Sequence, residues 1–519
     1  MPQHAYPENT HRVAAPPAPR RLASAMFVLL PCLAAAQDTG EAGAKRGWTI
    51  EPSVSLRQSF TDNQRLQTVK ESDAITEASA AVRVTGSGGP LRGFLDYSLT
   101  GSAYARNSDA NELRHFLAMA STAELVSGWA FVDLRGSYTQ QIVSAFGSQS
   151  PDPALNNSNR QDVGSLSVAP NLRGRFGGAV RYEARLSYEI TRAKGTDATD
   201  VANSSALLHL DSGGTGSPLG WTADVTHNVA DYRIGRRTFD TRARAGVTYV
   251  INREFRVGVT AGQERTDLQV LGGASNATWG GQFSWTPTER TLLSAEAEKR
   301  FFGTGYSLQL THRTPNTAWA VSGSRDISTD SSQGVASFGS AYDLFFRQFA
   351  STEPDAVKRD VLVRSFLQNN GINPNTVVVG GFLASSATLV RAQSASVALN
   401  GVRNTITLRA AASQSQRADE FATNFDDLST NKVVRERGIA LDWAFRLTPT
   451  SSINLTGSIQ RNKGDTNAQE TTLKAITVGW SAPLGARSTV SAGARHAVFE
   501  SNTSPYDENA LFAAIRLAF

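Results

Sequence analysis

The chain of 519 residues carries 51 Lys and Arg against 46 Asp and Glu, a formal net charge of +5. A charge so close to balance, without any basic run, gives no support for a nucleic-acid partner, and none is expected. The length would allow roughly two to four ordinary domains, but no Pro-rich or charge-rich linker divides the sequence, so we expect one repetitive architecture.

The N-terminal region has the layout of a secretory signal peptide. Arginines precede the apolar run Leu22–Ala36, which ends in three alanines, the small residues typical of a cleavage site. We therefore predict a signal peptide at residues 1–36 and a short linker at 37–46. The only cysteine, Cys32, lies in this signal, so burial and hydrogen bonds must hold the exported chain without disulfides. No later run approaches the roughly 20 apolar residues of a membrane helix.

From residue 47 onward, apolar and polar side chains alternate in segments of about 10 to 14 residues. The clearest segment has the apolar face Val180, Tyr182, Ala184, Leu186, Tyr188 and Ile190 and the polar face Arg181, Glu183, Arg185, Ser187, Glu189 and Thr191. The pattern recurs without interleaved helices, which favours a barrel in lipid with a watery interior. We predict that residues 47–519 form an all-β fold, a transmembrane antiparallel up-and-down β-barrel of about 22 strands, within a range of roughly 18 to 24.

The connections between these segments differ in length on the two sides of the predicted barrel. An even strand count places both ends of the barrel on one side, where short turns are expected. These turns include residues 86–90, 127–128, 286–289 and 482–485. Long connections at 61–73, 140–163, 264–274, 326–384 and 417–432 belong to the other side, with a short exception at 302–305. Seven tryptophans fall toward the side of the chain ends, as expected of an interfacial aromatic ring: Trp48, Trp129, Trp221, Trp285, Trp319, Trp443 and Trp480.

Residues 326–384 interrupt the strand pattern with a helical insert. Four aromatic side chains recur at helical spacing: Tyr342, Phe345, Phe346 and Phe349. Thr352 and Asp355 then provide an N-cap and a carboxylate three residues on, with a proline between them, before a second helical stretch. This insert in one outer loop could fold into the lumen as a plug or cover the surface as a cap, and the sequence does not decide between them.

The polar face of the best-patterned strands supplies the candidate lumen residues. They are Arg181, Arg185, Arg242, Arg244, Arg256, Glu296, Glu298 and Arg300. Rows of opposite charge could shape a pore for a polar solute. The interpretation that we favour is ion pairs that brace a wide barrel.

The sequence offers no catalytic or metal-binding pattern. The five histidines after residue 36 are scattered over different segments, without a nucleophile or carboxylate spacing beside them: His115, His209, His227, His312 and His496. There is no paired histidine at ligand spacing and no acidic calcium loop. We therefore predict no enzyme activity, no cofactor and no metal.

The last nine residues, 511–519, form an apolar face at strand spacing that ends in an aromatic residue: Leu511, Ala513, Ile515, Leu517 and Phe519. This segment resembles the closing strand of bacterial outer-membrane β-barrels, in which the terminal aromatic is part of an assembly signal. The resemblance implies the outer membrane of a Gram-negative bacterium, with the chain ends at the periplasmic side and the barrel-assembly machinery and membrane lipid as partners. The alternative is the final edge strand of a soluble β-domain.

Several short motifs resemble the outer-membrane β-barrel family associated with PEP-CTERM and exosortase systems. They are Asp62-Asn63, Trp279-Gly280, Trp285-Thr-Pro287-Thr-Glu-Arg290, Arg300-Phe-Phe-Gly303 with Tyr306, and the helical stretch 355–371. The resemblance implies a non-enzymatic role in exopolysaccharide export or assembly, with polysaccharide and export-system proteins as partners. It brings no catalytic residues. The alternative function is a general porin or structural barrel without a dedicated substrate.

Overall fold

The computed structural model describes residues 47–519, except 87, 156, 178, 213–216, 423–424, 466–468 and most of 334–380. Within 334–380 it describes residues 342, 346, 349, 359, 360, 362–364 and 367. The predicted signal peptide (1–36) and linker (37–46) lie outside the described residues. Residues from Gly47 to Phe519 form one compact unit.

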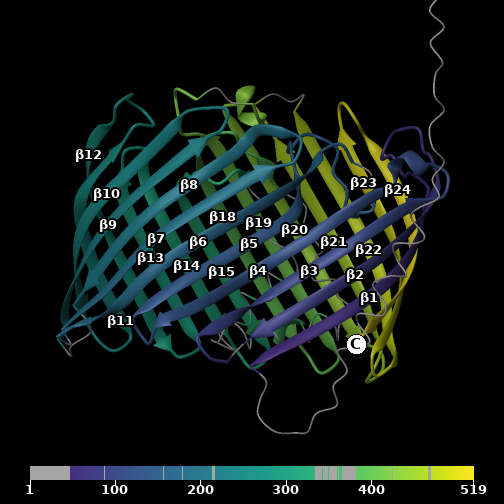
Figure 1. The fold of residues 1–519 in the computed structure, drawn as a ribbon, viewed down its shortest axis with the longest axis horizontal. Coiled ribbons are helices and arrows are strands. Elements are labelled where there is room, and N and C mark those ends of the chain that lie inside the picture. The colour runs from purple at the N-terminus through teal and green to yellow at the C-terminus, as the bar shows by residue number, and fades with distance from the viewer. Residues whose placement is uncertain are drawn as a thin grey trace, which may run out of the picture. The chain divides into compact units, whose positions relative to one another are not determined.

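A single sheet of 22 strands accounts for most of this unit (Figure 1). The first eleven strands are β1 (Trp48–Thr61), β2 (Asp73–Gly86), β3 (Leu91–Tyr104), β4 (Glu112–Val126), β5 (Ala130–Ile142), β6 (Arg160–Phe176), β7 (Val180–Ala193), β8 (Thr196–Asp211), β9 (Leu219–Tyr232), β10 (Arg237–Val250) and β11 (Phe255–Thr266). The other eleven are β12 (Ala274–Thr288), β13 (Thr291–Arg300), β14 (Gly303–Arg313), β15 (Thr317–Ser328), β18 (Thr388–Asn400), β19 (Asn404–Arg417), β20 (Val433–Arg446), β21 (Ser452–Lys463), β22 (Glu470–Gly485), β23 (Ser488–Ser501) and β24 (Tyr506–Ala518).

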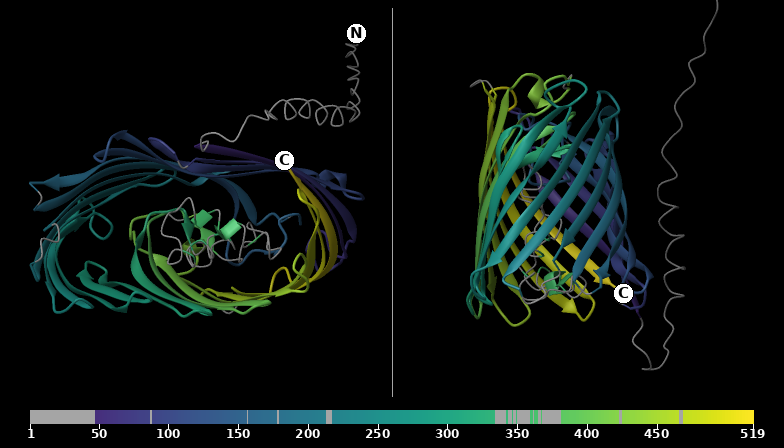
Figure 2. Two further views of the ribbon diagram at one scale, coloured as in Figure 1. Left: turned by 90° about the horizontal axis from the view of Figure 1, so that it is seen from below. Right: turned by 90° about the vertical axis from the view of Figure 1, so that its left-hand side faces the viewer.

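Each strand of the sheet pairs antiparallel with the next one in sequence, and β15 pairs with β18 across the insert. The last strand returns to the first, with β24 paired to β1 from Ser53↔Ala518 to Thr61↔Ala510. The sheet therefore closes on itself (Figure 2). The prediction of a 22-stranded up-and-down barrel is confirmed.

Short elements outside the barrel sheet lie in the connections. A two-stranded sheet joins β16 (Ser332–Gln333) to β17 (Phe382–Leu383) within the insert. Single 3-10 turns occur at η1 (Ser108–Ala110) and η3 (Asp427–Ser429). The described residues of the insert between these strands are helical at 342, 346, 359–360, 362–364 and 367, as the aromatic spacing predicted.

We call the end of the barrel where β1 starts and β24 finishes the terminal rim, and the opposite end the loop rim. Turns at the terminal rim are short, and Gly128 adopts a φ of 70° in one of them, which favours glycine. Two predicted turns, 286–289 and 482–485, start too early. The strands β12 and β22 continue through Pro287 and Pro483 with a shift of register at each proline, since proline has no N–H for the ladder. The insert also runs from 329 to 387, later at both ends than predicted, because β15 ends at Ser328 and β18 begins at Thr388.

Much of the outer face of the barrel is apolar, and its exposed side chains include Ile50, Leu186, Val259 and Ile439. All seven tryptophans of the predicted set lie on this face within a few residues of the terminal rim. Trp279 lies nearer the loop rim and is 66% exposed. An apolar band bordered by aromatic rings is the surface that a membrane requires of a barrel.

The described core lies inside the barrel, toward the loop rim. Its largest cluster joins inward-facing Ile75, Tyr104, Phe499 and Tyr506 to loop residues that include Leu155. A second cluster joins Phe382 of the insert to residues of two other loops. The loops therefore fold into the lumen and pack against its wall.

Candidate functional site: a filled lumen and its charged wall

The connection between β5 and β6, residues 143–159, turns into the lumen, and we call it the inward loop. Asn159 shapes its base, because its side chain accepts a hydrogen bond from the Ser144 N–H at 2.8 Å and donates to the Ser144 carbonyl at 2.8 Å. The tyrosine hydroxyls of the wall, Tyr104 and Tyr506, donate to carbonyls of the loop. The loop residues at the centre of these contacts are buried.

A buried ion network fastens the inward loop to the barrel wall. Asp152 of the loop accepts from Arg57 of β1 at 2.8 Å and from Arg495 of β23. Arg57 also pairs with Glu77 at 2.7 Å, and Arg495 with Glu508 at 2.9 Å. Burial alone would raise the pKa of Asp152, but the two guanidinium groups outweigh burial and hold that pKa well below its usual range. The carboxylate is therefore ionised at every physiological pH.

The described helical residues of the insert bind the wall at β2 and β3, near the terminal rim. Asp360 forms an ion pair with Arg83, and Arg364 forms one with Asp96. Arg83 and Asp96 are cross-strand partners on β2 and β3, three residues from the end of β2. Arg364 also contacts Asp360 at 3.1 Å, so the four charges form one cluster that we call the latch.

An apolar contact supports the latch. Val363 and Leu367 are buried against three aromatic side chains of the insert: Tyr342, Phe346 and Phe349. These three belong to the predicted aromatic stripe, and the Tyr342 hydroxyl donates to Asp360. The stripe therefore joins two helical parts of the insert and positions the Asp360 carboxylate.

The insert is held a second time at the loop rim, where it returns to β18. The Gly381 N–H donates to Glu436 of β20 at 2.7 Å, and the Leu383 N–H donates to the Val143 carbonyl at 3.1 Å. The Ser385 N–H donates to Asp426 at 2.6 Å. We call this set of contacts the clasp. The described residues of the insert thus lie inside the barrel (Figure 2), which favours the plug over the surface cap.

Asp427 joins the clasp to the inward loop. Its carboxylate accepts from the Ser144 hydroxyl and the Ala145 N–H, each at 2.7 Å. Burial raises the pKa of this carboxyl to about 6, although the two hydrogen bonds act in the opposite direction. The acid that joins the clasp to the inward loop therefore has a pKa of about 6.

The inward wall formed by β7 to β13 carries charges that remain more accessible. Arg181 pairs with Asp211 at 2.9 Å and Arg185 pairs with Asp133 at 2.9 Å. The side chain of Arg181 is 51% exposed, whereas that of Asp152 in the buried network is 2% exposed. The inward loop and the insert thus cover one part of the wall, and the charged part is left in contact with water.

The remaining candidate lumen residues lie on the same inward face. Arg242 pairs with Glu298 at 3.0 Å, and Arg244 pairs with Glu296 at 2.6 Å. Arg300 is buried and contacts three carboxylates, those of Asp240, Glu264 and Asp326. Arg256 faces inward near the terminal rim, without an ion pair among the described residues. Most of the predicted charges are therefore ion-paired along the wall.

The proposed assembly residues lie on the outer face of β24. Leu511, Ile515, Leu517 and Phe519 are exposed there, and Ala513 shares their face. Phe512, Ala514 and Arg516 point to the lumen side of the same strand. The Phe519 N–H donates to the Pro52 carbonyl at 3.0 Å, which extends the seam between the first and last strands to the chain end.

Sequence reasoning missed the inward loop and its ion network. The signal available was an apolar pair, Ala154-Leu155, inside a connection otherwise rich in Pro, Asn and Ser. Arg57 and Arg495 were two further signals, since each places a charge in the middle of a strand. The partners of these charges lie 95 and 343 residues away from them in sequence.

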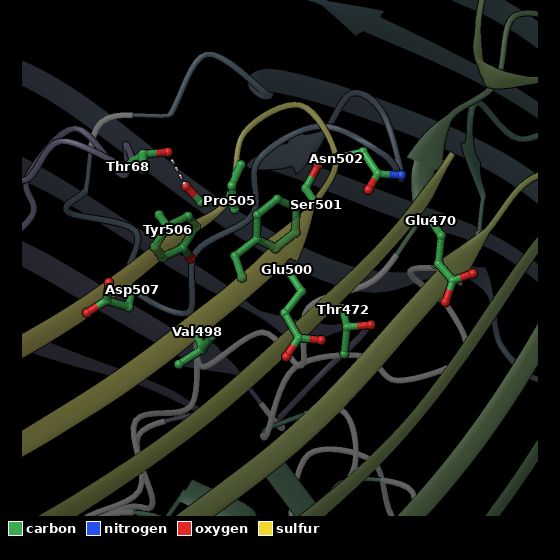
Figure 3. A pocket seen from close by; sticks show the side chains of 11 residues that line it. Thr68, Glu470, Thr472, Val498, Glu500, Ser501, Asn502, Pro505, Tyr506 and Asp507 are labelled. Carbon is green, nitrogen blue, oxygen red and sulfur yellow. Dashed lines mark hydrogen bonds between the residues drawn. The ribbon is translucent and has the colours of Figure 1, made fainter. Parts of the chain in front are cut away.

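A separate hollow opens at the loop rim beside β22, β23 and β24 (Figure 3). It has a volume of about 550 Å³, and Glu470, Glu500 and Asp507 contribute carboxylates to its lining. Thr68 donates to the Pro505 carbonyl at 3.0 Å at its edge. Among the described residues, no three His, Cys, Asp or Glu side chains are grouped as ligands for a metal ion.

The strands, the apolar outer face and the filled lumen together define a transmembrane β-barrel with an internal plug. No helix in the described part of the chain is long and apolar enough to cross a membrane.

Compared with protein-family models and with curated protein sequences, the chain has no match. Solved structures that resemble it include the siderophore receptor PirA from Acinetobacter baumannii, with 9% identity, a TM-score of 0.47 and coverage of 92% of this chain and 81% of that one. The FrpB iron transporter from Neisseria meningitidis has 11% identity and a TM-score of 0.46, with coverage of 92% of this chain and 82% of that one. OccK5 (OpdH) from Pseudomonas aeruginosa has 11% identity and a TM-score of 0.31, with coverage of 91% of this chain and 98% of that one. The fold assignment of this chain rests on its own strand pairing.

Proposed function

We propose that this chain is a non-enzymatic outer-membrane barrel that forms a gated conduit for a polar solute. Its terminal rim would face the periplasm, because short turns and both barrel ends lie there. The observation that carries the proposal is the plug, which is fastened at the latch and again at the clasp. A barrel of this size would leak small solutes if its lumen were empty, so an internal gate is a functional requirement.

The latch gives this gate a physical mechanism. Four charges in alternating order, two on the wall and two on the insert, attract one another strongly only while water is excluded. A solute or partner that competes for Arg83 or Asp96 would weaken that attraction. Movement of the insert away from β2 and β3 would then widen the water-filled part of the lumen.

The cargo that we propose is an extracellular polysaccharide, within a PEP-CTERM/exosortase-linked export system. This part of the proposal is supported by the family resemblance of the motifs at 62–63, 279–280, 285–290 and 300–306. Inward-facing aromatic rings would be the usual surface for a sugar chain, but five of them are buried: Tyr104, Phe131, Tyr232, Phe499 and Tyr506. Contact with the cargo would therefore depend on the charged wall and its hydrogen-bonding groups.

The buried aromatic rings also favour a second candidate function. A general porin needs only a charged, water-filled wall, which β7 to β13 provide. Conductance that saccharides do not block would support the porin, whereas block by an acidic or neutral polysaccharide would support the export barrel.

The first experiment tests the gate. The double substitution Asp360→Asn with Arg364→Gln should raise the single-channel conductance in a planar bilayer, because it removes both insert charges of the latch. Deleting residues 330–380 and rejoining the strands should raise conductance and antibiotic sensitivity further. The double substitution Arg237→Gln with Asp231→Asn removes a matched pair of charges on the outer face and is the control. Unchanged conductance in both altered proteins would show that the insert does not gate the lumen.

The second experiment tests the cargo. A strain that lacks the gene should release less extracellular polysaccharide while continuing to synthesise the polymer inside the cell. Restoring the wild-type gene should restore release. If release is normal in the deletion strain, the general porin replaces the export barrel as the proposed function.

A further inference from the structure

The outer face of the barrel carries a band of positive charge near the loop rim. One row runs in register across six neighbouring strands, in the order Tyr306, Arg325, Arg391, Gln414, Arg435 and Lys463. A second row, one step closer to the membrane centre, pairs Arg437 with Arg461. With Lys299 of β13, these cations form what we call the basic belt: Lys299, Arg325, Arg391, Arg435, Arg437, Arg461 and Lys463.

Like charges face one another directly within the belt. Arg325 is the cross-strand partner of Arg391, Arg435 of Lys463, and Arg437 of Arg461. Like charges at directly opposed positions destabilise a sheet. A bound anion would remove this repulsion, so the arrangement itself points to a negatively charged ligand.

The belt contains no acid of its own. All described carboxylates on β13, β14, β15, β18, β19, β20 and β21 occupy inward positions: Glu296, Glu298, Asp326, Glu436 and Asp442. Glu470 of β22 pairs with Arg461 and Lys463 and marks one end of the belt. Beyond it lies the carboxylate-lined hollow of Figure 3.

The rest of the loop rim has a different charge pattern. Lys474 pairs with Glu500, and Lys70 pairs with Asp62 at 2.9 Å and with Asp507. On the far side of the barrel, Arg237 is the cross-strand partner of Asp231. Lys474 and Arg237 thus have an acid beside them, and the outer-face residues Arg192 and Arg265 lie opposite uncharged partners. The like-charge pairs make the belt a distinct sector.

The belt lies at the border of the apolar band. On β20, Ile439 and Leu441 follow Arg437 on the outer face, and Trp443 follows at the terminal rim. The eight residue steps from Arg435 to Trp443 cover about 27 Å along a strand that rises about 3.4 Å per residue. At a tilt of roughly 40°, this is about 20 Å across the membrane, close to the height of an apolar band of about 25 Å. Arg435 and Trp443 therefore lie near opposite membrane surfaces.

The position of Trp279 is explained by the same border between the basic belt and the apolar band. It was the exception to the tryptophan ring at the terminal rim, and its cross-strand partner is Lys299 of the belt. Its indole is 66% exposed on the outer face. The eighth tryptophan thus lies at the other membrane surface, next to a cation.

The side chains of the belt are oriented while keeping donors available. Arg391 donates through Nε to the Tyr306 hydroxyl at 3.1 Å, which leaves its two Nη groups for a ligand. Arg325 donates to the carbonyls of Thr304 at 2.6 Å and Phe302 at 3.2 Å. Within the described residues, Lys299, Arg435 and Arg437 have no ion-pair partner. Guanidinium groups suit phosphate because they present two parallel N–H donors.

We propose that the basic belt binds the phosphate groups of a phosphorylated, multiply acylated glycolipid in the outer leaflet. The acyl chains lie along the apolar strip directly below, which includes Leu308, Ile439, Leu441 and Ile459. The inference rests on the proposed outer-membrane orientation and goes beyond the conduit function. It gives one sector of the barrel a fixed lipid neighbour.

Native mass spectrometry of the purified full-length barrel tests the site with three probes: bis-phosphorylated lipid A, the same lipid without its phosphates, and inorganic phosphate. The triple variant Arg325→Gln, Arg391→Gln, Arg435→Gln should lose at least about tenfold in affinity for the phosphorylated lipid. The matched triple variant Arg192→Gln, Arg237→Gln, Lys474→Gln removes as many outer cations and should bind like the wild type. Heat-modifiable migration in gels shows that each variant is folded.

Equal loss in the two variants would overturn the proposal, since bulk charge would then explain binding. Equal binding of the dephosphorylated lipid would also overturn it. Competition by inorganic phosphate at the same concentration as the lipid would show an anion site without lipid specificity, which contradicts the role of the apolar strip. Conductance is measured on the same samples, so a barrel that binds lipid but does not conduct would refute the conduit and leave the belt intact.

Discussion

Arginines occur on both faces of this barrel, but the two faces treat them differently. On the inner face of β9, β10 and β11, register places opposite charges together, as in Arg242 with Glu264 and Arg244 with Asp224. Within the basic belt on the outer face, register places like charges together, as in Arg325 with Arg391. The charges of the inner arrangement are neutralised by partners within the protein. The outer arrangement needs a partner from the membrane, so the same residue type braces the barrel on one face and forms a binding surface on the other.

The largest expected effect comes from the chain end, where the outer face must be recognised before any charge matters. Deleting Phe519 removes an outward aromatic ring and the hydrogen bond to Pro52. We expect most of the protein to remain unassembled in the periplasm, as measured by the outer-membrane fraction on semi-native gels. Phe519→Tyr keeps the ring and should assemble normally. Normal yield after the deletion would contradict the assembly role of 511–519.

Breaking the buried inner network should cost more stability than any change in the basic belt. Asp152→Asn leaves Arg57 and Arg495 with less compensation in the covered part of the lumen, and we expect a loss of about 3–5 kcal/mol in the free energy of unfolding. Arg437→Gln on the outer face should change it by less than about 0.5 kcal/mol. Urea unfolding in lipid vesicles measures both. Similar losses of unfolding free energy in the two variants would contradict the difference proposed between the inner and outer faces.

The water-accessible inward wall formed by β7 to β13 should control ion selectivity, whereas the outer face should not. Arg244→Gln leaves Asp224, Glu296 and Glu298 with one positive charge fewer. One unit charge about 10 Å from a passing ion in water contributes about 0.4 kcal/mol, with opposite sign for a cation and an anion, so the cation-to-anion permeability ratio should rise roughly fourfold. Reversal potentials in a salt gradient measure this ratio. A similar change in Arg437→Gln would show that the lumen wall is not the selective surface.

The smallest effect concerns pH and the clasp. Because burial raises the pKa of Asp427 to about 6, the folded clasp holds this proton more tightly than the unfolded chain does. Its stability should therefore rise as the pH falls from about 7 to about 4, and should fall again as the pH rises through about 6. Hydrogen exchange of the Ala145 amide, corrected for its intrinsic pH dependence, measures the change.

Asp427→Asn is the control for this pH effect. An asparagine can accept from the Ala145 N–H through its oxygen and donate to the Ser144 hydroxyl, so the clasp should persist with a flatter pH profile. An unchanged profile in this variant would assign the titration to another group.

The sequence by itself determined the barrel and its two faces. The alternation in residues 180–191, the short turns at one rim and the apolar face of 511–519 are local patterns, because neighbouring side chains of a strand must point to opposite sides. They gave a count of about 22 strands, the inward face of the candidate lumen arginines and the rim that holds seven tryptophans. The aromatic spacing at 342–349 likewise predicted helix, since that pattern is also local.

Only the tertiary structure decided what fills the lumen and which charges meet. Asp152 joins Arg57 and Arg495 across 95 and 343 residues, and Asp360 of the insert joins Arg83 on a strand near the start of the chain. Such contacts depend on the register of strands around a closed ring and on the direction in which each loop folds. Alternation fixes the face on which a charge lies, but it carries no information about which distant charge shares that face at the same height.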